Sequence, residues 1–431
     1  MTRRILVGIV LLAGVALAWV HGRSDAPLAA ADASAACRVA LAPASGSTDI
    51  GREIARARDG ARREVRAKQA LERLGQLYVS RARISNDPRD YTLAEAAAGC
   101  LEARYPGEAS ALLLRGHVLH QLHRFSEAEQ LAHALVARRS YVLDYGLLGD
   151  VLLEQGRLDE AAEAYQRMMD LKPFYQSYTR AAHLRWLRGN LDGAIEAVRL
   201  AIASASPRDP ELSAWAWTRL SSYQLQAGRL DEAADAAETA LAHQPDYAAA
   251  LEAQGRILLA RNRTSDAIAV LQRASQSSGE PDVQWLLADA LRLQGREGEA
   301  GLVERDLTTR GALLDPRTVA LYLATRRLEP TRAVALAEKE LRARRDIFTL
   351  DAHAWALAAS DRFAEAGDVM ARALAAGTSD ARLFLHAGII HAAAGRSGEA
   401  ARWLKRAHEL RAMLYPSESA LIAKHLNATE N

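Results

Sequence analysis

Histidine side chains cluster in one short stretch of the chain, and their spacing is the clearest hint of chemistry in the sequence. His117, His120 and His123 follow one another at steps of three, and His133 and Asp150 come soon after. Steps of three keep side chains near one face of a helix, and a few imidazoles with a carboxylate can bind a divalent metal ion. A metal site also needs supporting groups from neighbouring elements. Since no second motif supplies them, we favour polar residues of a binding groove and assign no metal ligands.

The sequence contains no other pattern that is typical of an active site. It has no P-loop, no G-x-G-x-x-G, no G-x-S-x-G, no H-E-x-x-H and no C-x-x-C. Its 55 basic and 53 acidic residues nearly balance, so a concentrated basic surface for nucleic acid is not expected. We therefore expect a protein that is not an enzyme, with no catalytic residues, no cofactor and no nucleic-acid partner.

A repeat organises most of the chain and must position these side chains. A turn residue and a few polar residues precede an alanine, as in Gly156 to Ala161 and Gly228 to Ala233. Successive gaps between these alanines are 33 or 34 residues, except for one of 39. The ten alanines are Ala94, Ala128, Ala161, Ala194, Ala233, Ala267, Ala300, Ala333, Ala366 and Ala400.

Each repeat also carries the features of two packed helices. A small residue, for example Gly149, stands twelve positions before the alanine, where it lets two helices approach closely. Pro106, Pro173 and Pro245 stand twelve positions after it, where proline ends a helix. Apolar residues recur at helical spacing in between. Each unit is thus predicted to be a helix, a tight turn and an antiparallel helix.

This repeat resembles the tetratricopeptide repeat (TPR), whose period is about 34 residues. The resemblance covers residues 68–414, and we interpret the chain as a bacterial exported TPR protein. It implies an all-α fold, a right-handed superhelix of antiparallel helix pairs. The signature residues that the chain retains are Leu74, Gly75, Tyr78, Tyr145, Leu148, Gly149, Trp217 and Leu220.

The sequence divides into four parts on this interpretation. Residues 1–20 are a signal peptide or membrane anchor, and residues 21–67 are a linker and a leading charged helix. Residues 68–414 form about ten TPR units, and residues 415–431 form a C-terminal capping helix and tail. The predicted units are 68–108, 109–141, 142–174, 175–213, 214–247, 248–280, 281–313, 314–346, 347–380 and 381–414.

The resemblance implies that the first helix of each unit lines a concave groove, where a protein or peptide partner binds. Family positions that point into this groove give the candidate site. Tryptophan is favoured at binding hot spots, but each of the three groove tryptophans could instead pack against a neighbouring unit. The candidate groove residues are His117, His120, Asp150, Glu154, His183, Trp186, Arg256, Trp285, Asp289 and Trp355.

The N-terminus has the pattern of an export signal. Arg3 and Arg4 precede an uncharged, mostly apolar run from Ile5 to Val20, and small residues around Leu17 fit a cleavage site. The alternative is an uncleaved anchor helix, although sixteen residues are short for a membrane span. Both interpretations place the repeats in the periplasm or on the outer face of the cytoplasmic membrane. Membrane contact is expected only through this segment, if it stays uncleaved.

The chain has two cysteines, Cys37 and Cys100. In an oxidising compartment they could form a disulfide. The alternative, which we favour, is two independent thiols, with Cys100 a small core residue of a helix.

These features predict a binding function. We expect a TPR scaffold or adaptor that holds a protein or peptide in its concave groove in the cell envelope. The repeats and the N-terminal parts account for the chain, so a separate catalytic domain is not expected. The alternative is a metal-binding or metal-dependent envelope protein that uses the histidine cluster of the first regular repeats.

Overall fold

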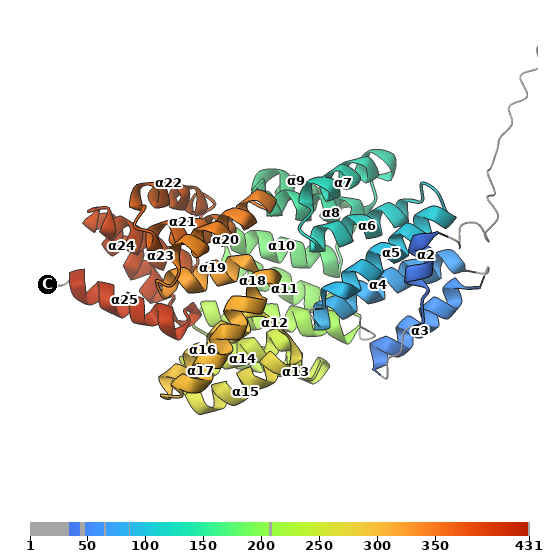
Figure 1. The fold of residues 1–431 in the computed structure, drawn as a ribbon. Coiled ribbons are helices and arrows are strands. Elements are labelled where there is room, and N and C mark those ends of the chain that lie inside the picture. The colour runs from blue at the N-terminus through green and yellow to red at the C-terminus, as the bar shows by residue number, and fades with distance from the viewer. Residues whose placement is uncertain (1–33, 44–47, 64–65, 86, 207–208, 430–431) are drawn as a thin grey trace, which may run out of the picture.

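In the computed structural model, all regular secondary structure of the described residues is helical (Figure 1). The predicted all-α fold is therefore confirmed. None of the helices in the described part is long and apolar enough to span a membrane. The predicted signal or anchor segment, residues 1–20, lies outside the described residues. The described residues are 34–43, 48–63, 66–85, 87–206 and 209–429.

Ten antiparallel helix pairs follow one another along the described chain at the spacing of the repeat (Figure 1). The second helix of the seventh pair continues through a π-helical turn, η1, into the short helix α18. The pairs are α4 (Ala67–Ser85) and α5 (Pro88–Arg104); α6 (Ala109–Gln121) and α7 (Phe125–Arg139); α8 (Val142–Glu154) and α9 (Leu158–Leu171); α10 (Tyr175–Leu187) and α11 (Leu191–Ser204); α12 (Pro210–Gln226) and α13 (Leu230–His243); α14 (Ala248–Ala260) and α15 (Thr264–Ser277); α16 (Pro281–Leu293) and α17 (Glu297–Asp306), with η1 (Leu307–Gly311) and α18 (Ala312–Leu314); α19 (Pro316–Thr325) and α20 (Pro330–Ala343); α21 (Ile347–Ala359) and α22 (Phe363–Leu374); α23 (Ala381–Ala393) and α24 (Ser397–Glu409).

The ten repeat alanines mark where the two helices of each pair come closest. Each lies in the second helix of its pair, and each has 0% of its surface exposed. The small residue of the first helix is placed as tightly: a Cβ atom added to Gly149 would lie 2.3 Å from Cε1 of Tyr165. The period in the sequence is therefore the period of closest helix contact.

The tight turn within a pair uses a left-handed backbone conformation. Gly156 has a φ of +76°, which glycine adopts without steric cost. Where the turn glycine is missing, another residue takes this conformation: His123 has a φ of +56° and Asn262 a φ of +58°. His123 is therefore a turn residue and does not continue the helical face that carries His117.

Two helices precede the repeats and pack on the first pair. They are α2 (Ala35–Ala40) and α3 (Asp49–Ala61). The backbone N–H of Cys37 donates to the Ser34 hydroxyl at 3.1 Å, which caps α2. The structure thus differs from the expected linker, because a helix begins at Ala35.

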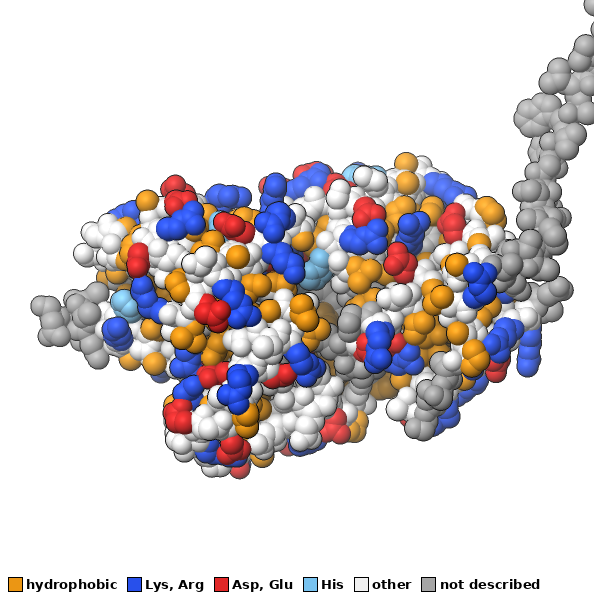
Figure 2. Space-filling view, viewed as in Figure 1, with side chains coloured by type: hydrophobic (Ala, Val, Ile, Leu, Met, Phe, Trp, Pro, Cys, Tyr) orange, Lys and Arg blue, Asp and Glu red, His pale blue; other side chains and the backbone are white. Residues whose placement is uncertain are grey.

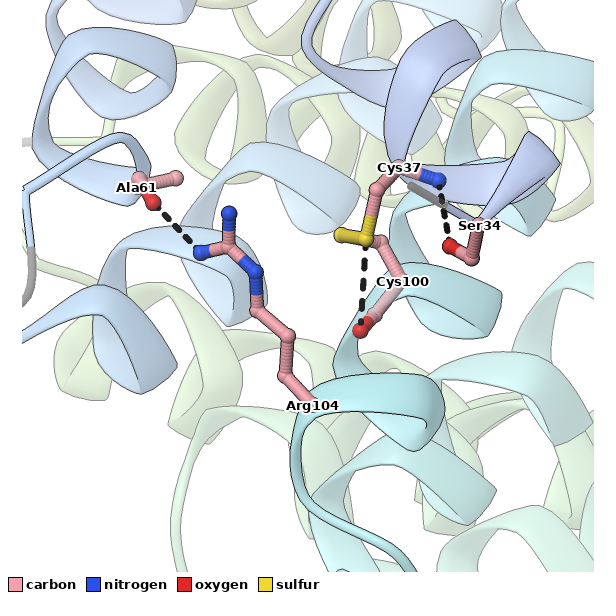
Figure 3. The surroundings of a disulfide bond; sticks show 5 residues. All are labelled: Ser34, Cys37, Ala61, Cys100 and Arg104. Carbon is pink, nitrogen blue, oxygen red and sulfur yellow. Dashed lines mark hydrogen bonds between the residues drawn. A yellow bond between two sulfur atoms is a disulfide. The ribbon is translucent and has the colours of Figure 1, made fainter. Parts of the chain in front are cut away.

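Cys37 and Cys100 form a disulfide that joins α2 to α5 (Figure 3). The preference for two independent thiols is therefore wrong. That prediction treated Cys37 as part of a linker, whereas α2 brings its Cα atom to 4.5 Å from that of Cys100. Nearby, the Arg104 guanidinium of α5 donates to the carbonyl oxygen of Ala61 at 2.6 Å and holds the end of α3.

The row of helix pairs turns, so that loops of late units contact the helix ends and turns of earlier ones. After α8, the backbone N–H of Arg345 donates to the carbonyl oxygen of Glu154 at 2.9 Å. At the end of α10, the Thr378 hydroxyl donates to the carbonyl oxygen of Leu187, a residue 191 positions earlier in the sequence. Such contacts join units that lie far apart in the sequence.

The chain ends in a segment that covers the inner side of the sixth and seventh pairs. We call residues 410–429 the C-terminal segment; it contains the 3-10 turn η2 (Arg411–Met413) and α25 (Pro416–Thr429). The expected terminal helix is present, and α25 packs against α16, α23 and α24 (Figure 1). It therefore contacts the end of the array and an inner helix at the same time.

Candidate binding site on the inner face

The first candidate residues lie on α6 and α8. Asp150 accepts hydrogen bonds from the Tyr165 hydroxyl and from Nε of Arg180, both at 2.8 Å. Burial opposes ionisation of this carboxyl, but Arg180 outweighs it and lowers the pKa of Asp150. Burial also lowers the pKa of His117 to about 4 and lowers that of His120. Both imidazoles are therefore neutral at pH 7, and the carboxylate is already paired within the chain.

The remaining histidines of the predicted cluster turn to different partners. Nδ1 of His123 lies 3.3 Å from Oε1 of Glu340, across the closed superhelix. Nε2 of His133 lies 3.4 Å from Oε1 of Glu129 on the same helix. Within the described ranges, no group of three His, Cys, Asp or Glu side chains is arranged to hold a metal ion. The geometry gives the metal-binding alternative no support.

Glu154, at the end of α8, takes part in closing the superhelix. Its Oε2 lies 3.4 Å from Nη1 of Arg344. Nε of Arg344 in turn lies 2.8 Å from Oε1 of Glu340. This candidate residue therefore ties the third pair to the segment that follows the eighth.

Arg256, Trp285 and Asp289 lie where the C-terminal segment covers the inner face. Trp285 is 0% exposed, and its Nε1 donates to the Ser417 hydroxyl at 3.1 Å. The backbone N–H of Ser417 donates to Oδ2 of Asp289 at 2.8 Å. Nη2 of Arg256 donates to the carbonyl oxygen of Met413 at 2.7 Å. These candidate residues do hold a segment of polypeptide, but the segment belongs to the same chain.

Trp355, on α21, is packed between helices. It is 6% exposed, and its Nε1 donates to the Thr325 hydroxyl at 3.0 Å. Its ring stacks on His386, with 4.2 Å between the ring centroids. His386 in turn lies 2.8 Å from Asp351. The structure therefore places Trp355 in the core between the eighth, ninth and tenth pairs.

His183 and Trp186, on α10, border the space that stays open on the inner face. Two cavities of about 230 and 270 Å³ lie here. Because Trp186, Arg219, Arg317 and Phe348 border both cavities, the two adjoin, and we call them together the inner chamber. Figure 2 shows that the molecular surface is hollowed near the middle of the face in view.

Aromatic rings and a guanidinium form one wall of the inner chamber. The rings of Trp186 and Phe348 are stacked, with 5.5 Å between their centroids. Nε1 of Trp186 donates to Oε1 of Gln226 at 2.7 Å and fixes the indole. The guanidinium carbon of Arg219 lies 5.8 Å from the centroid of Trp186 and 5.2 Å from that of Tyr223. Such contacts place a cation over aromatic faces.

Burial and Arg219 together set the protonation of His183. Burial, and after it the charge of Arg219, lowers the pKa of His183 to about 4. His183 is therefore a neutral imidazole at pH 7 that borders the inner chamber beside a permanent positive charge.

Arg219, Tyr223, Arg317 and Phe348 are among the residues of the inner chamber that were not identified from the sequence. Arg219 and Tyr223 are four positions apart on α12, a spacing that predicts contact on a helix and could have drawn attention to them. Arg317 and Phe348 come from the eighth and ninth pairs, which reach the chamber only because the superhelix closes. No local pattern marks them.

A family model and the buried repeat positions agree on the family. The model described as "Tetratricopeptide repeat" matches residues 147–210 and 218–281. The same helix pair, with its buried alanine, continues on both sides of these matches. The chain therefore contains tetratricopeptide repeats at residues 147–210 and 218–281, within a longer row of similar helix pairs.

Solved structures of other proteins match parts or most of the chain. TTC0263, a thermophilic TPR protein of Thermus thermophilus, is 22% identical over 44% of this chain and 99% of its own, with a TM-score of 0.37. MamA is 19% identical over 38% of this chain and 93% of its own, with a TM-score of 0.31. The APC/C hetero-tetramer Cut9–Hcn1 matches at 13% identity over 88% of this chain and 90% of that one, with a TM-score of 0.33. Among curated proteins, none matches the sequence.

Proposed function

We propose that the protein is an adaptor of the cell envelope that holds a protein or peptide partner at the inner chamber. TPR solenoids are scaffolds for protein interactions, and their inner helices provide the binding surface. The role proposed is binding and not catalysis.

This proposal rests on one observation: the chain's own C-terminal segment covers only part of the inner face. Along α14 and α16 the chain's own C-terminal segment is bound, and Trp285 is 0% exposed. Along α10, His183 and Trp186 border the chamber, and the C-terminal segment lines only one of its two cavities, through Met413 and Tyr415. A partner that uses the inner face therefore finds its open part at α10.

The disulfide supports the envelope location. Disulfides persist in oxidising compartments such as the periplasm and are rare in the cytosol. Cys37 and Cys100 are joined and buried, with 1% and 0% of their surfaces exposed. Together with the export pattern of residues 1–20, this favours the periplasm or the outer face of the cytoplasmic membrane.

Affinity capture from envelope fractions tests the proposed function. The full chain carries a C-terminal tag, and the captured proteins are identified by mass spectrometry. Trp186→Ala should lose a partner that the wild type captures. Trp403→Ala is the matched control, because Trp403 lies on α24 and stacks on Phe384, away from the inner chamber.

Both variants are first checked for folding by circular dichroism. A partner captured by the wild type and by Trp403→Ala, but not by Trp186→Ala, supports the proposal. Equal capture by all three contradicts the assignment of the partner to the inner chamber. For the location, thiol-blocking during cell lysis should leave Cys37 and Cys100 unlabelled; labelling of both would contradict an oxidising compartment.

A further inference from the structure

The same arrangement of arginine, tryptophan and tyrosine occurs twice on the inner face. In the first, the guanidinium of Arg219 lies over Trp186 and Tyr223, at 5.8 and 5.2 Å from the ring centroids. In the second, the guanidinium of Arg382 lies over Trp285 and Tyr415, at 5.0 and 4.9 Å. We call these the Arg219 cluster and the Arg382 cluster.

The Arg382 cluster holds a carboxylate. Glu418, at the start of α25, binds Nε of Arg382 through Oε1. Its Oε2 accepts the backbone N–H of Tyr415 at 2.8 Å, and the side chain of Glu418 is 0% exposed. A guanidinium that stacks on aromatic rings and also binds a carboxylate uses both of its recognition modes. In this cluster the chain provides its own acidic ligand.

The Arg219 cluster has the cation and the rings but no carboxylate. Among the described residues, none makes a hydrogen bond or an ion pair with the Arg219 guanidinium. Arg317, which also borders the inner chamber, has its closest carboxylate oxygen at 3.6 Å, on Asp346.

The carboxylates that border the inner chamber are engaged elsewhere. Asp351 binds His386 at 2.8 Å, and Asp380 caps α23 by accepting the backbone N–H of Leu383 at 3.0 Å. Glu154 lies 3.4 Å from Arg344, as described above.

Two further carboxylates of the chamber lie beside the C-terminal segment. The Tyr415 hydroxyl lies within hydrogen-bonding distance of both, at 3.2 Å from Asp282 and 3.4 Å from Glu252. Neither carboxylate contacts Arg219. Among the residues that the structure describes, no carboxylate is therefore placed to accept a hydrogen bond from Arg219.

We propose that the inner chamber binds a carboxylate, of a small organic acid or of an acidic peptide side chain, with Arg219 as its main partner and Arg317 beside it. This proposal names the chemistry of the ligand at the site of the proposed function. It rests on that function only because it uses the same chamber. Trp186 and Phe348 would contact the apolar part of the ligand, as Trp285 contacts the C-terminal segment. The two adjoining cavities, of about 230 and 270 Å³, together fall near the lower end of the ~300–1,000 Å³ of drug-sized sites, which favours a compact acid or one side chain.

Isothermal titration calorimetry with matched probes on the full chain tests this proposal. The small-acid pair is benzoate and its neutral analogue benzamide. The peptide pair is N-acetyl-Tyr-Glu-amide and N-acetyl-Tyr-Gln-amide, and inorganic phosphate serves as a general anion. At least one carboxylate probe should bind about tenfold more tightly than its neutral analogue and than phosphate. The pair that binds more tightly tells whether a small acid or a peptide is preferred.

Substitutions then assign the site. Arg219→Gln should weaken the binding of the carboxylate probe about tenfold. Arg199→Gln is the control, because Arg199 is exposed on α11 and does not border the chamber. Should Arg219→Gln fail to fold, Arg317→Gln takes its place, with a smaller loss expected.

Three results would overturn the proposal: neither carboxylate binds the wild type, phosphate binds as tightly, or the Arg219→Gln and Arg317→Gln variants bind as the wild type does. The proposed function would survive each of these, provided that Trp186→Ala still loses its captured partner.

Discussion

The Arg219 and Arg382 clusters are built from the same three residue types, yet one is filled and the other is open. At the Arg382 cluster, Glu418 supplies a carboxylate and α25 covers Trp285 completely. The Arg219 cluster borders the chamber with no carboxylate partner among the described residues, whereas Arg382 and Tyr415, which also line one of its cavities, are held by Glu418. The difference lies in where α25 packs, because it contacts α16 and α23, which carry Trp285 and Arg382, whereas Trp186 lies on the fourth pair.

From this comparison we infer that one cluster contributes to stability and that the other is available for binding. A filled cluster fixes the end of the superhelix to its seventh pair, since the C-terminal segment contacts α16 and α24 together. An open cluster keeps its polar groups for a ligand, which costs stability in the free protein. Substitutions in the two clusters should therefore have opposite consequences for folding and for binding.

The tryptophans provide the largest expected contrast. Trp285→Ala removes a fully buried ring and should cost about 3–5 kcal/mol of unfolding free energy. Trp186→Ala removes a half-buried ring and should cost less, about 1–2 kcal/mol. Urea denaturation followed by circular dichroism measures both. Equal losses would mean that the two clusters are covered to the same degree.

The carboxylate of the filled cluster gives the next contrast. Glu418→Ala leaves the half-buried Arg382 guanidinium without its ion-pair partner, and should cost about 3 kcal/mol. Arg219→Gln removes a charge that has no carboxylate partner among the described residues, and should change stability by less than about 0.5 kcal/mol. Thermal unfolding at neutral pH compares the two. A larger loss for Arg219→Gln would show that Arg219 is structural.

A further expected effect is on the pH dependence of stability. Burial and Arg219 lower the pKa of His183 to about 4 in the folded chain, whereas an unfolded histidine titrates near pH ~6.5. The unfolded state thus binds more protons between these values, so stability falls as the pH is lowered from about 6.5 to 4, with a slope of at most about 1.4 kcal/mol per pH unit from this group. His183→Gln should flatten the profile in this window. A profile unchanged by the substitution would contradict the buried neutral imidazole.

A bound carboxylate should act on the same window. A negative charge beside Arg219 favours the charged imidazole and raises the pKa of His183. Benzoate at a saturating concentration should therefore weaken the loss of stability on acidification in the wild type. An identical profile with and without benzoate would count against binding next to His183.

The helix pair of each repeat could be predicted from the sequence. Contacts between units that lie far apart in the chain could not. Alanines such as Ala161 recur at a fixed period because the two helices of each pair need the same close contact. The helix pairs could therefore be predicted from this period. Trp285 was predicted to be a binding residue of the groove. No residue near it in the sequence indicates that Ser417 occupies that part of the groove.

The chamber and the disulfide were missed for the same reason. Arg219 meets Phe348 around the inner chamber only after the superhelix has turned, and Glu418 reaches Arg382 from the end of the chain. Cys37 pairs with Cys100 because α2 packs on α5, a contact between elements that the linker composition did not predict. Contacts between distant units, unlike the repeat itself, do not produce a periodic pattern in the sequence.

Hydroxyl-radical footprinting of the free protein, with oxidation of each tryptophan measured by mass spectrometry, tests the central claim most directly. If one cluster is filled by the C-terminal segment and the other faces a chamber, Trp186 will be oxidised readily, and Trp285 and Trp355 will be protected. Oxidation of Trp285 to the same extent as Trp186 would contradict the account, because it would mean that the C-terminal segment does not occupy the inner face.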